Sequence, residues 1–315
     1  MKYYLGLDVG GSKVAYGIAN ENKEIIAKTA IKTNHNYDEM VVTMAETALG
    51  FLAEQNIDLA DVVSVGVGLP GVIDYHTNRL VMATNLGWFD KDVPGDMKKI
   101  LGKDVFVAND ADAATLGEQL AGAAKGYNSA TMLTLGTGVG GGVIYNGKIF
   151  GGGDGGGLEI GHLTLVAGGL ECSCTNKGCL EMYASTTALL RMAREHATSD
   201  SEIYALCGGD LSKIDGRLLF QAVDSGDEAA LATLAQYQEY LVAACYTAIM
   251  AYRPEVLVIG GGISARGDLL IAPVQTRLQE KLERWGTIAK TPVVAAALGN
   301  DAGILGACFL TAMEA

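Results

Sequence analysis

Two glycine-rich stretches decide the fold, LDVGGS at residues 7–12 and LGTGVG at residues 135–140. Each lies between two segments with the apolar pattern of strands, and therefore predicts a tight turn from one strand into the next. Because both halves of the chain repeat this local plan, we expect two duplicated α/β domains that face each other across a central cleft. The length of 315 residues agrees with two domains, since single hydrophobic cores stop growing near ~250–300 residues.

Strands and helices are expected to alternate in both halves, which favours a largely parallel sheet. The expected strands are residues 3–8, 14–19, 24–29, 62–69, 105–108, 131–135, 142–145, 148–150, 256–259 and 291–296. The expected helices are residues 37–56, 97–101, 111–121, 185–196, 228–252, 269–284 and 302–313. We expect a smaller N-terminal domain over residues 1–118 and a larger C-terminal domain over 119–301, with the helix at 302–315 packing back on the first domain.

The charge balance limits the kinds of partner. The chain has 36 acidic and 23 basic side chains and a net charge of −13. Because binding to nucleic acids or anionic membranes needs a surplus of Lys and Arg, we expect neither partner. No apolar run approaches the ~18 residues of a membrane-spanning helix, and the N-terminus lacks the pattern of a signal peptide. We therefore expect a soluble, cytoplasmic protein.

Three glycine-rich loops each follow an expected strand, and their exposed N–H groups could hold phosphates. In the first loop, Asp8 could hold hydrated Mg²⁺. The second offers the Thr137 hydroxyl, and the third, at residues 260–262, could face the adenosine end of a nucleotide. A hairpin turn is the alternative for any single loop, but three together favour nucleotide binding. The candidate nucleotide-binding residues are Asp8, Gly10, Gly11, Ser12, Lys13, Gly136, Thr137, Gly138, Gly140, Gly261 and Gly262.

The second loop also satisfies the dinucleotide-binding pattern G-x-G-x-x-G. That pattern binds a pyrophosphate only where it opens a helix. Here the chain continues as VIYNG at residues 143–147, which predicts a strand and a hairpin. A nicotinamide-dependent enzyme is therefore disfavoured, and the P-loop pattern ending in Gly-Lys-Ser/Thr is absent as well.

Asn109 and Asp110 stand between an expected strand and an expected helix. Open α/β sheets bind ligands at the carboxyl ends of their strands. Either residue could instead cap the helix, since Asn and Asp are favoured at that position. A carboxylate near a sugar hydroxyl could accept its proton during phosphoryl transfer, and Asp110 is the candidate for this role.

His162, Cys172, Cys174 and Cys179 form a His-x9-Cys-x-Cys-x4-Cys cluster. Three thiolates and an imidazole are a closed tetrahedral set that is typical of structural Zn²⁺, and soft thiolates exclude Mg²⁺ or Ca²⁺. A redox thiol pair and cysteines merely packed in a loop are the alternatives, although the single residue between Cys172 and Cys174 disfavours a thioredoxin-like pair. Zinc would brace an otherwise structureless loop.

Glu159 and Glu181 flank this cluster. A metal-braced loop would hold their carboxylates in fixed positions, where they could accept hydrogen bonds from sugar hydroxyls. Solvated surface carboxylates are the alternative.

The order of these motifs resembles the ROK family (repressors, open reading frames, kinases) of sugar kinases and sugar-responsive regulators. The resemblance covers nearly the whole chain. The matching segments are DVGGSK at 8–13 and LGTGVGGG at 135–142 for the two phosphate loops, NDADA at 109–113 for the catalytic segment, and EIGH at 159–162 with CSCTNKGCLE at 172–181 for the family signature. It implies duplicated actin-like (ribonuclease H-like) ATPase domains.

The resemblance also implies roles for single residues. Asp110 is then the general base, and His162 binds zinc with the three cysteines. The implied sugar-binding residues are Gly71, Asn85, Asn109, Asp110, Glu159, His162 and Glu181. Ser12 stands where the family usually has Thr. Thr175 stands where it usually has Gly, and a residue with positive φ would be strained there.

We therefore expect an enzyme that uses Mg·ATP to phosphorylate the 6-hydroxyl of a hexose and that carries a structural zinc ion. Glucose is the first acceptor expected. Fructose, N-acetylglucosamine, N-acetylmannosamine and allose are alternatives, because the motif residues bind hydroxyls that these sugars share. The resemblance implies an N-terminal helix-turn-helix in regulators of the family, and none is expected ahead of the first phosphate loop, so a kinase is favoured over a regulator. A sugar sensor without activity is a further alternative, but both phosphate loops and Asp110 are present, which favours a kinase. A homodimer or homotetramer is expected.

Overall fold

The computed structural model describes residues 1–310, except for the side chains of residues 287–289. The chain divides into two compact units. Unit 1 comprises residues 1–130, 142–158 and the described residues from 297 onward, and unit 2 comprises residues 131–141 and 159–296. The domain limits expected from the sequence, after residues 118 and 301, stay a proposal.

The first five-stranded sheet lies in unit 1 and has the strand order β3-β2-β1-β4-β8. Its strands are β1 (Tyr3–Val9), β2 (Lys13–Asn20), β3 (Ile25–Lys32), β4 (Val62–Leu69) and β8 (Val105–Asn109). The strands β1, β4 and β8 are parallel, whereas β2 and β3 are antiparallel to their neighbours. The expectation of a largely parallel sheet is thus wrong for this half, because tight turns join β1, β2 and β3 and only longer crossovers allow parallel pairing.

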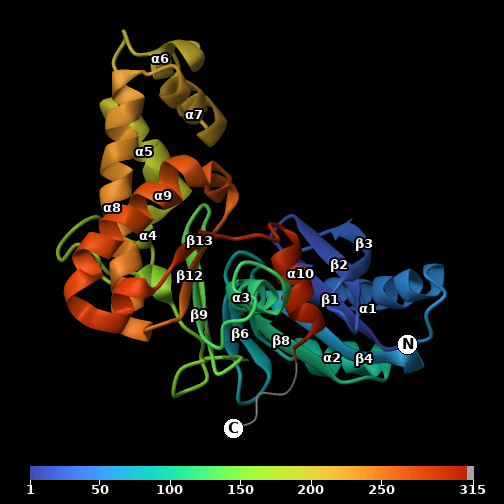
Figure 1. Cartoon of the computed structure of the whole chain (residues 1–315). Coiled ribbons are helices and arrows are strands. Elements are labelled where there is room, and N and C mark those ends of the chain that lie inside the picture. The colour runs from blue at the N-terminus through green and yellow to red at the C-terminus, as the bar shows by residue number, and fades with distance from the viewer. Residues whose placement is uncertain (311–315) are drawn as a thin grey trace. The chain divides into compact units, whose positions relative to one another are not determined.

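The helices of unit 1 are α1 (Tyr37–Glu54), α2 (Val93–Leu101), α3 (Asp110–Ala121) and α10 (Asp301–Cys308). Helix α10 lies directly against β1 and α3 (Figure 1). This close approach requires glycine at Gly306, where a Cβ atom would overlap the carbonyl oxygen of Ala113. The helix ends at Cys308, before the expected end at 313, and residues 311–315 lie outside the described residues.

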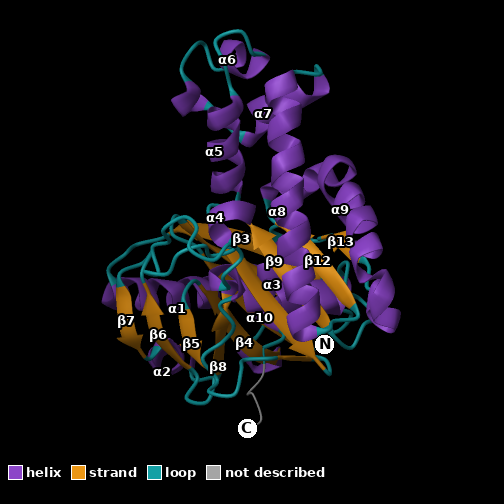
Figure 2. Ribbon diagram, turned by 90° about the vertical axis from the view of Figure 1, so that its left-hand side faces the viewer, coloured by secondary structure: helices purple, strands orange, loops and turns teal. Residues whose placement is uncertain are grey.

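A three-stranded antiparallel sheet of unit 1 was not expected from the sequence. Its strands are β5 (Val72–Asp74), β6 (Arg79–Ala83) and β7 (Trp88–Lys91), which lie side by side (Figure 2). Trp88 is buried, whereas Met82 and its cross-strand partner Phe89 are exposed. The short strands and their exposed apolar residues hide the alternation that would identify them in the sequence.

The second five-stranded sheet has the order β11-β10-β9-β12-β13. Its strands are β9 (Ala130–Leu135), β10 (Val139–Tyr145), β11 (Lys148–Ile149), β12 (Val256–Gly260) and β13 (Val293–Ala295). The strands β12 and β13 are parallel, and β10 and β11 form the expected hairpin. This sheet repeats the plan of the first, as the two glycine-rich stretches predicted, but it is mixed as well, so the expectation of a largely parallel sheet is wrong for this half too.

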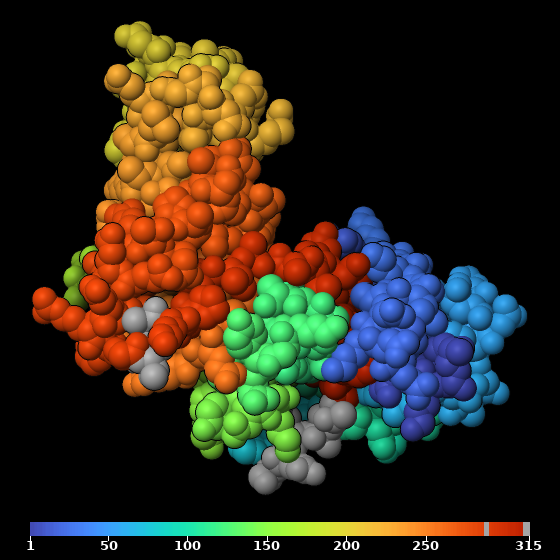
Figure 3. All heavy atoms as spheres, viewed as in Figure 1, coloured from blue at the N-terminus to red at the C-terminus, as the bar shows by residue number. Residues whose placement is uncertain are grey.

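The helices of unit 2 are α4 (Glu181–Ala184), α5 (Thr186–His196), α6 (Glu202–Leu206), α7 (Gly216–Asp224), α8 (Glu228–Tyr252) and α9 (Gly267–Leu282). Helix α9 packs along α8 (Figure 3), where Gln238 donates a hydrogen bond to the carbonyl of Leu269 at 2.6 Å. Neither α6 nor α7 was expected. Among the described helices, none combines the length and the apolar character that crossing a membrane requires.

Candidate active site

The first phosphate loop, residues 10–12, joins β1 to β2 in unit 1. A hydrogen bond of 2.8 Å from the Gly10 N–H to the Lys13 carbonyl closes the turn. The hydroxyl of Thr33, just after β3, donates to the Gly10 carbonyl at 2.7 Å and supports the loop from the neighbouring strand. Gly11 and Ser12 are exposed, so a ligand can reach the backbone of this loop.

Asp8 lies near the end of β1, and its side chain is partly buried. Burial raises the pKa of this carboxyl above its ordinary value, while the charge of Lys13 opposes the shift. Gly303 of α10 is so close that a Cβ atom there would lie 3.1 Å from Asp8 Oδ2. Asp8 and Lys13 both line a cavity of about 390 Å³. A carboxylate in this setting is suited to a hydrated Mg²⁺ ion that also binds phosphates.

Asn109 and Asp110 take different positions at the carboxyl end of β8. Asn109 is the N-cap of α3, because its side-chain oxygen accepts hydrogen bonds from the N–H groups of Ala111 and Asp112 at 2.8 and 3.3 Å. Its side-chain amide donates to the Gly71 carbonyl at 2.9 Å. Asp110 is the first residue of α3 and is partly exposed. Asn109 is therefore the residue that caps α3.

Tyr75 and Asp112 form a buried pair behind this segment that sequence reasoning missed. The Tyr75 hydroxyl donates to Asp112 Oδ2 at 2.5 Å and accepts from the backbone N–H of Asn109 at 3.1 Å. Asp112 is only 1% exposed. Burial and the Asp112 charge raise the pKa of Tyr75 well above its ordinary value, which keeps the phenol protonated. The signal that could have identified this pair in the sequence is the second carboxylate, Asp112, within the segment NDADA at 109–113.

The other two expected sugar-site residues of unit 1 lie in the region of the three-stranded sheet. Gly71 has a φ of +108° and lies against the backbone of Met82, so a side chain there would be strained and would clash. Its carbonyl accepts the Asn109 hydrogen bond described above. Asn85 lies in the exposed turn between β6 and β7.

The second phosphate loop, residues 135–140, joins β9 to β10. The Gly136 N–H donates to the Gly138 carbonyl at 3.0 Å, and Gly136 and Thr137 are exposed. The third loop leaves β12 at Gly261, which has a φ of +94° and packs against the backbone of Leu135. The second and third loops therefore lie together in unit 2, as nucleotide binding by both would require.

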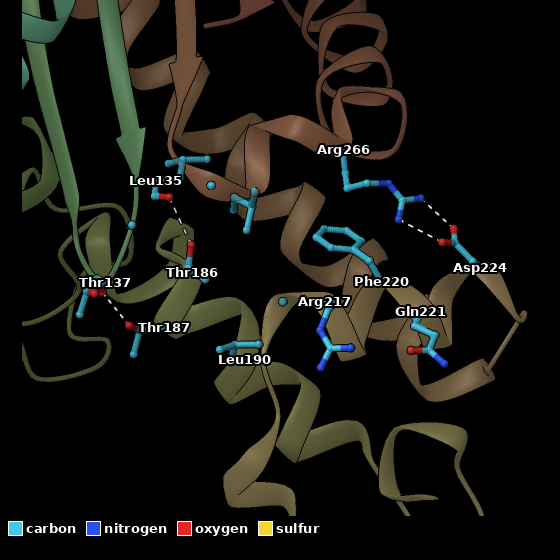
Figure 4. A pocket seen from close by; sticks show the side chains of 14 residues that line it. Leu135, Thr137, Thr186, Thr187, Leu190, Arg217, Phe220, Gln221, Asp224 and Arg266 are labelled. Atoms are coloured by element: carbon cyan, nitrogen blue, oxygen red, sulfur yellow. Dashed lines mark hydrogen bonds and ion pairs between the residues drawn. The ribbon is translucent and has the colours of Figure 1, made fainter. Parts of the chain in front are cut away.

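A pocket of about 760 Å³ opens beside these two loops (Figure 4). Gly136, Thr137 and Gly262 line one part of it, and the rest is lined by Leu135, by residues of α5 and α7, and by Ile263 and Arg266, which follow the third loop. Arg266 forms a bidentate ion pair with Asp224, at 2.7 and 3.1 Å, and its guanidinium lies 5.0 Å from the centre of the Phe220 ring. Sequence reasoning missed Asp224 and Phe220, because α7 lies more than 75 residues from the second loop along the chain. It also missed Arg266, which lies shortly after Gly262 of the third loop.

The predicted zinc ligands do lie together in unit 2. One ligand atom each from His162, Cys172, Cys174 and Cys179 falls within 4.8 Å of the other three. His162 Nδ1 is 3.6 Å from Cys172 Sγ, and the Sγ atoms of Cys174 and Cys179 are 3.5 Å apart. Tetrahedral zinc separates such atoms by about 3.5–3.8 Å, given bonds of ~2.3 Å to sulfur and ~2.0 Å to nitrogen. The donor set and its geometry thus fit zinc.

Thr175 lies in the turn between Cys174 and Cys179 and has a φ of +73°. Left-handed backbone is unfavourable for a β-branched residue, so the strain expected at this position is present. The turn is nevertheless closed, because the Thr175 N–H donates to the Cys172 carbonyl at 3.0 Å.

The two flanking glutamates differ in their surroundings. Glu159 is exposed just before the helical turn Ile160–His162. Glu181 is partly buried at the start of α4, and its Oε2 accepts a hydrogen bond of 3.2 Å from the Val139 N–H. Its other oxygen lies 3.5 Å from Cys172 Sγ. Glu181 therefore lies between the zinc ligands and the second phosphate loop.

Comparison with known proteins agrees with this assembly of motifs. A glucokinase from Halalkalibacterium halodurans is 34% identical, over 99% of this chain and 96% of that protein. An N-acetyl-D-glucosamine kinase from Vibrio cholerae is 32% identical, over 98% of this chain and 99% of that protein.

A solved structure shares the α/β architecture of two mixed sheets. It is a ROK family glucokinase from Streptomyces griseus in complex with glucose and AMPPNP, with a TM-score of 0.79 and 32% identity over 97% of this chain and 98% of that one. The ROK family model matches residues 4–314. The chain therefore belongs to the ROK family and is a sugar kinase of that family.

Proposed function

We propose that the chain transfers the γ-phosphoryl group of Mg·ATP to the 6-hydroxyl of a hexose, with glucose as the preferred acceptor. The observation that carries this proposal is the position of Asp110 at the carboxyl end of β8. There Asn109 takes the helix cap, and the buried Tyr75–Asp112 pair fixes the backbone beside it. A carboxylate fixed in this way is suited to accept a hydroxyl proton.

In the proposed reaction, the sugar 6-oxygen attacks the γ-phosphorus and the bond from that phosphorus to the β,γ-bridging oxygen breaks. The hydroxyl proton passes to Asp110, and ADP leaves. Mg²⁺, when bound with ATP, neutralises charge on the phosphates, and Asp8 would hold it. The N–H groups of the two phosphate loops would hold the phosphate oxygens, and zinc, bound by His162 and the three cysteines, would brace the loop between Glu159 and Glu181.

The pocket beside the second phosphate loop supports a nucleoside triphosphate as the donor. Its volume of about 760 Å³ suits a molecule of nucleotide size. Gly261 and Gly262 would face the adenosine, and the Phe220 ring, held by Arg266, offers an apolar surface to it. The relative from Streptomyces griseus has AMPPNP, an ATP analogue, in its structure.

Glucose is proposed first because several relatives over the full length are glucokinases. N-acetylglucosamine is the second candidate, since kinases of that sugar are 30–32% identical to this chain. Fructose, N-acetylmannosamine and allose, and a sensor without activity, remain alternatives. We assign the sugar hydroxyls to Gly71, Asn85, Asn109, Asp110, Glu159, His162 and Glu181. His162 can serve both sites, because its Nδ1 faces Cys172 and leaves Nε2 for a sugar.

An ADP-release assay across these five sugars tests the proposal. We expect the highest kcat/KM with glucose and a loss of at least about 10²-fold in kcat for Asp110→Asn, the usual contribution of a general base. Asp104→Asn, which changes an exposed carboxylate of the same unit, is the matched control and should keep full activity. Full activity of Asp110→Asn would exclude Asp110 as the base.

The cytoplasmic location and the assembly into a homodimer or homotetramer stay predictions. Light scattering after gel filtration tests the assembly.

A further inference from the structure

Two neighbouring threonines hold the second phosphate loop from outside. Thr186 donates its N–H to the Gly136 carbonyl at 2.8 Å and its hydroxyl to the Leu135 carbonyl at 3.2 Å. Thr187 donates its hydroxyl to the Thr137 carbonyl at 2.7 Å. Figure 4 shows both hydroxyl contacts. Three successive carbonyls of the loop are thus fixed by the start of α5. Because the N–H of Gly136 donates to the Gly138 carbonyl and that of Val139 to Glu181, we assign the phosphates to the N–H groups of Thr137 and Gly138.

Glu181 holds the same loop from the start of α4. Its Oε2 accepts the Val139 N–H at 3.2 Å. A Cβ atom at Gly138 would overlap this carboxylate, so the loop and the glutamate are in direct contact. We call residues 181–187 the clamp segment, because both of its ends bind the second phosphate loop.

The clamp segment follows the zinc ligands without any intervening loop. Cys179 is two residues before Glu181, and the Leu180 N–H between them donates to the Leu163 carbonyl at 2.8 Å. The Tyr183 hydroxyl of α4 accepts the N–H of Leu170, which precedes Cys172, at 2.8 Å. A displacement of the zinc loop would therefore move the clamp segment as well.

We propose that the clamp segment couples the zinc site to the binding of the nucleotide phosphates, with Thr186, Thr187 and Glu181 as positioning residues for the second phosphate loop. The proposal rests on the proposed nucleotide-binding function. Zinc orders the loop that carries its ligands. Because the clamp segment is hydrogen-bonded to both the zinc loop and the second phosphate loop, an ordered zinc loop also holds the phosphate loop in place. Because coupling between two binding sites is reciprocal, a bound nucleotide must stabilise zinc by the factor by which zinc strengthens nucleotide binding.

Variants that remove single hydroxyls test the coupling with little change of shape. They are Thr186→Val, Thr187→Val and the double variant, with Thr187→Ser to restore the hydroxyl. Thr276→Val is the matched control, because its hydroxyl donates to a backbone carbonyl in α9, away from the loop. The dissociation constant of ADP is measured by calorimetry, and the release of zinc to a chromogenic chelator is timed with and without saturating ADP.

We expect each single Val variant to weaken ADP binding by about two- to tenfold, the range for one lost hydrogen bond. The KM for ATP should rise while the KM for the hexose stays constant. In the unmodified protein and in Thr276→Val, ADP should slow zinc release, and this protection should shrink in the double variant and return in Thr187→Ser.

Two results would overturn the coupling, and they are distinguishable from each other. If ADP binds and turnover occurs but zinc release is the same with and without ADP, the coupling alone is wrong. If ADP does not bind at all, the proposed donor site is wrong and the coupling fails with it. Equal ADP protection in the double variant and the unmodified protein would show that the threonines do not carry the coupling.

Discussion

Thr175→Gly should strengthen the zinc site. Thr175 has a φ of +73°, and left-handed backbone costs a residue with a Cβ atom roughly 1–2 kcal/mol. Glycine removes this cost but adds about 0.4–1 kcal/mol of conformational entropy to the unfolded chain. The side chain of Thr175 is exposed, and the turn hydrogen bond to Cys172 uses its backbone N–H, so glycine loses little else.

The net gain is about 0.5–1 kcal/mol, which corresponds to about two- to fivefold tighter zinc binding. Competition with a chelator of known affinity measures this change. Ser173→Gly is the matched control, because Ser173 is an exposed neighbour without a positive φ, and its replacement should weaken the site. Equal weakening by both substitutions would refute the reasoning from strain.

Three further predictions concern unit 1. Gly306→Ala should lower the free energy of unfolding by about 1–3 kcal/mol, because the new Cβ atom would overlap the Ala113 carbonyl and push α10 away; urea denaturation measures this. Tyr75→Phe should lower the free energy of unfolding by about 1–3 kcal/mol, because buried Asp112 loses the hydrogen bond from the phenol. In the kinetic assay, the same substitution should lower kcat more than it raises KM. Asp8→Asn should raise the free energy of unfolding at pH 7 but abolish magnesium-dependent turnover. Because burial raises the pKa of Asp8 in the folded state, the folded protein binds more protons, so this stability gain should vanish as the pH falls below the ordinary pKa of 3.8.

Elements with a local signal could be predicted from the sequence. Helix α8 has the predicted bounds, Glu228–Tyr252, because it is long and its ends carry clear signals, with Asp227 as the cap. The cluster of His162, Cys172, Cys174 and Cys179 could be predicted because its residue types and spacing are typical of structural zinc sites. The glycine loops were identifiable because tight turns between strands need glycine.

Features that depend on tertiary contacts could not be predicted in this way. The contacts of Arg266 with Asp224 and Phe220 in the large pocket arise because the fold brings α7 beside the third loop. Which residue of the Asn109–Asp110 pair caps α3 was open until the side-chain hydrogen bonds of Asn109 to the Ala111 and Asp112 N–H groups identified it as the cap. The contact of Glu181 with the Val139 N–H was likewise hidden, because 42 residues separate the two partners.

The most direct test of the central claim is to identify the product. The chain is incubated with Mg·ATP and glucose, and coupling of phosphorus to the protons of the modified carbon is read by nuclear magnetic resonance. We predict one product, phosphorylated on the 6-oxygen, formed in equal amount to ADP and lost in Asp110→Asn. A phosphate on any other hydroxyl, or ADP formation without a sugar phosphate from any of the five sugars, would contradict the account.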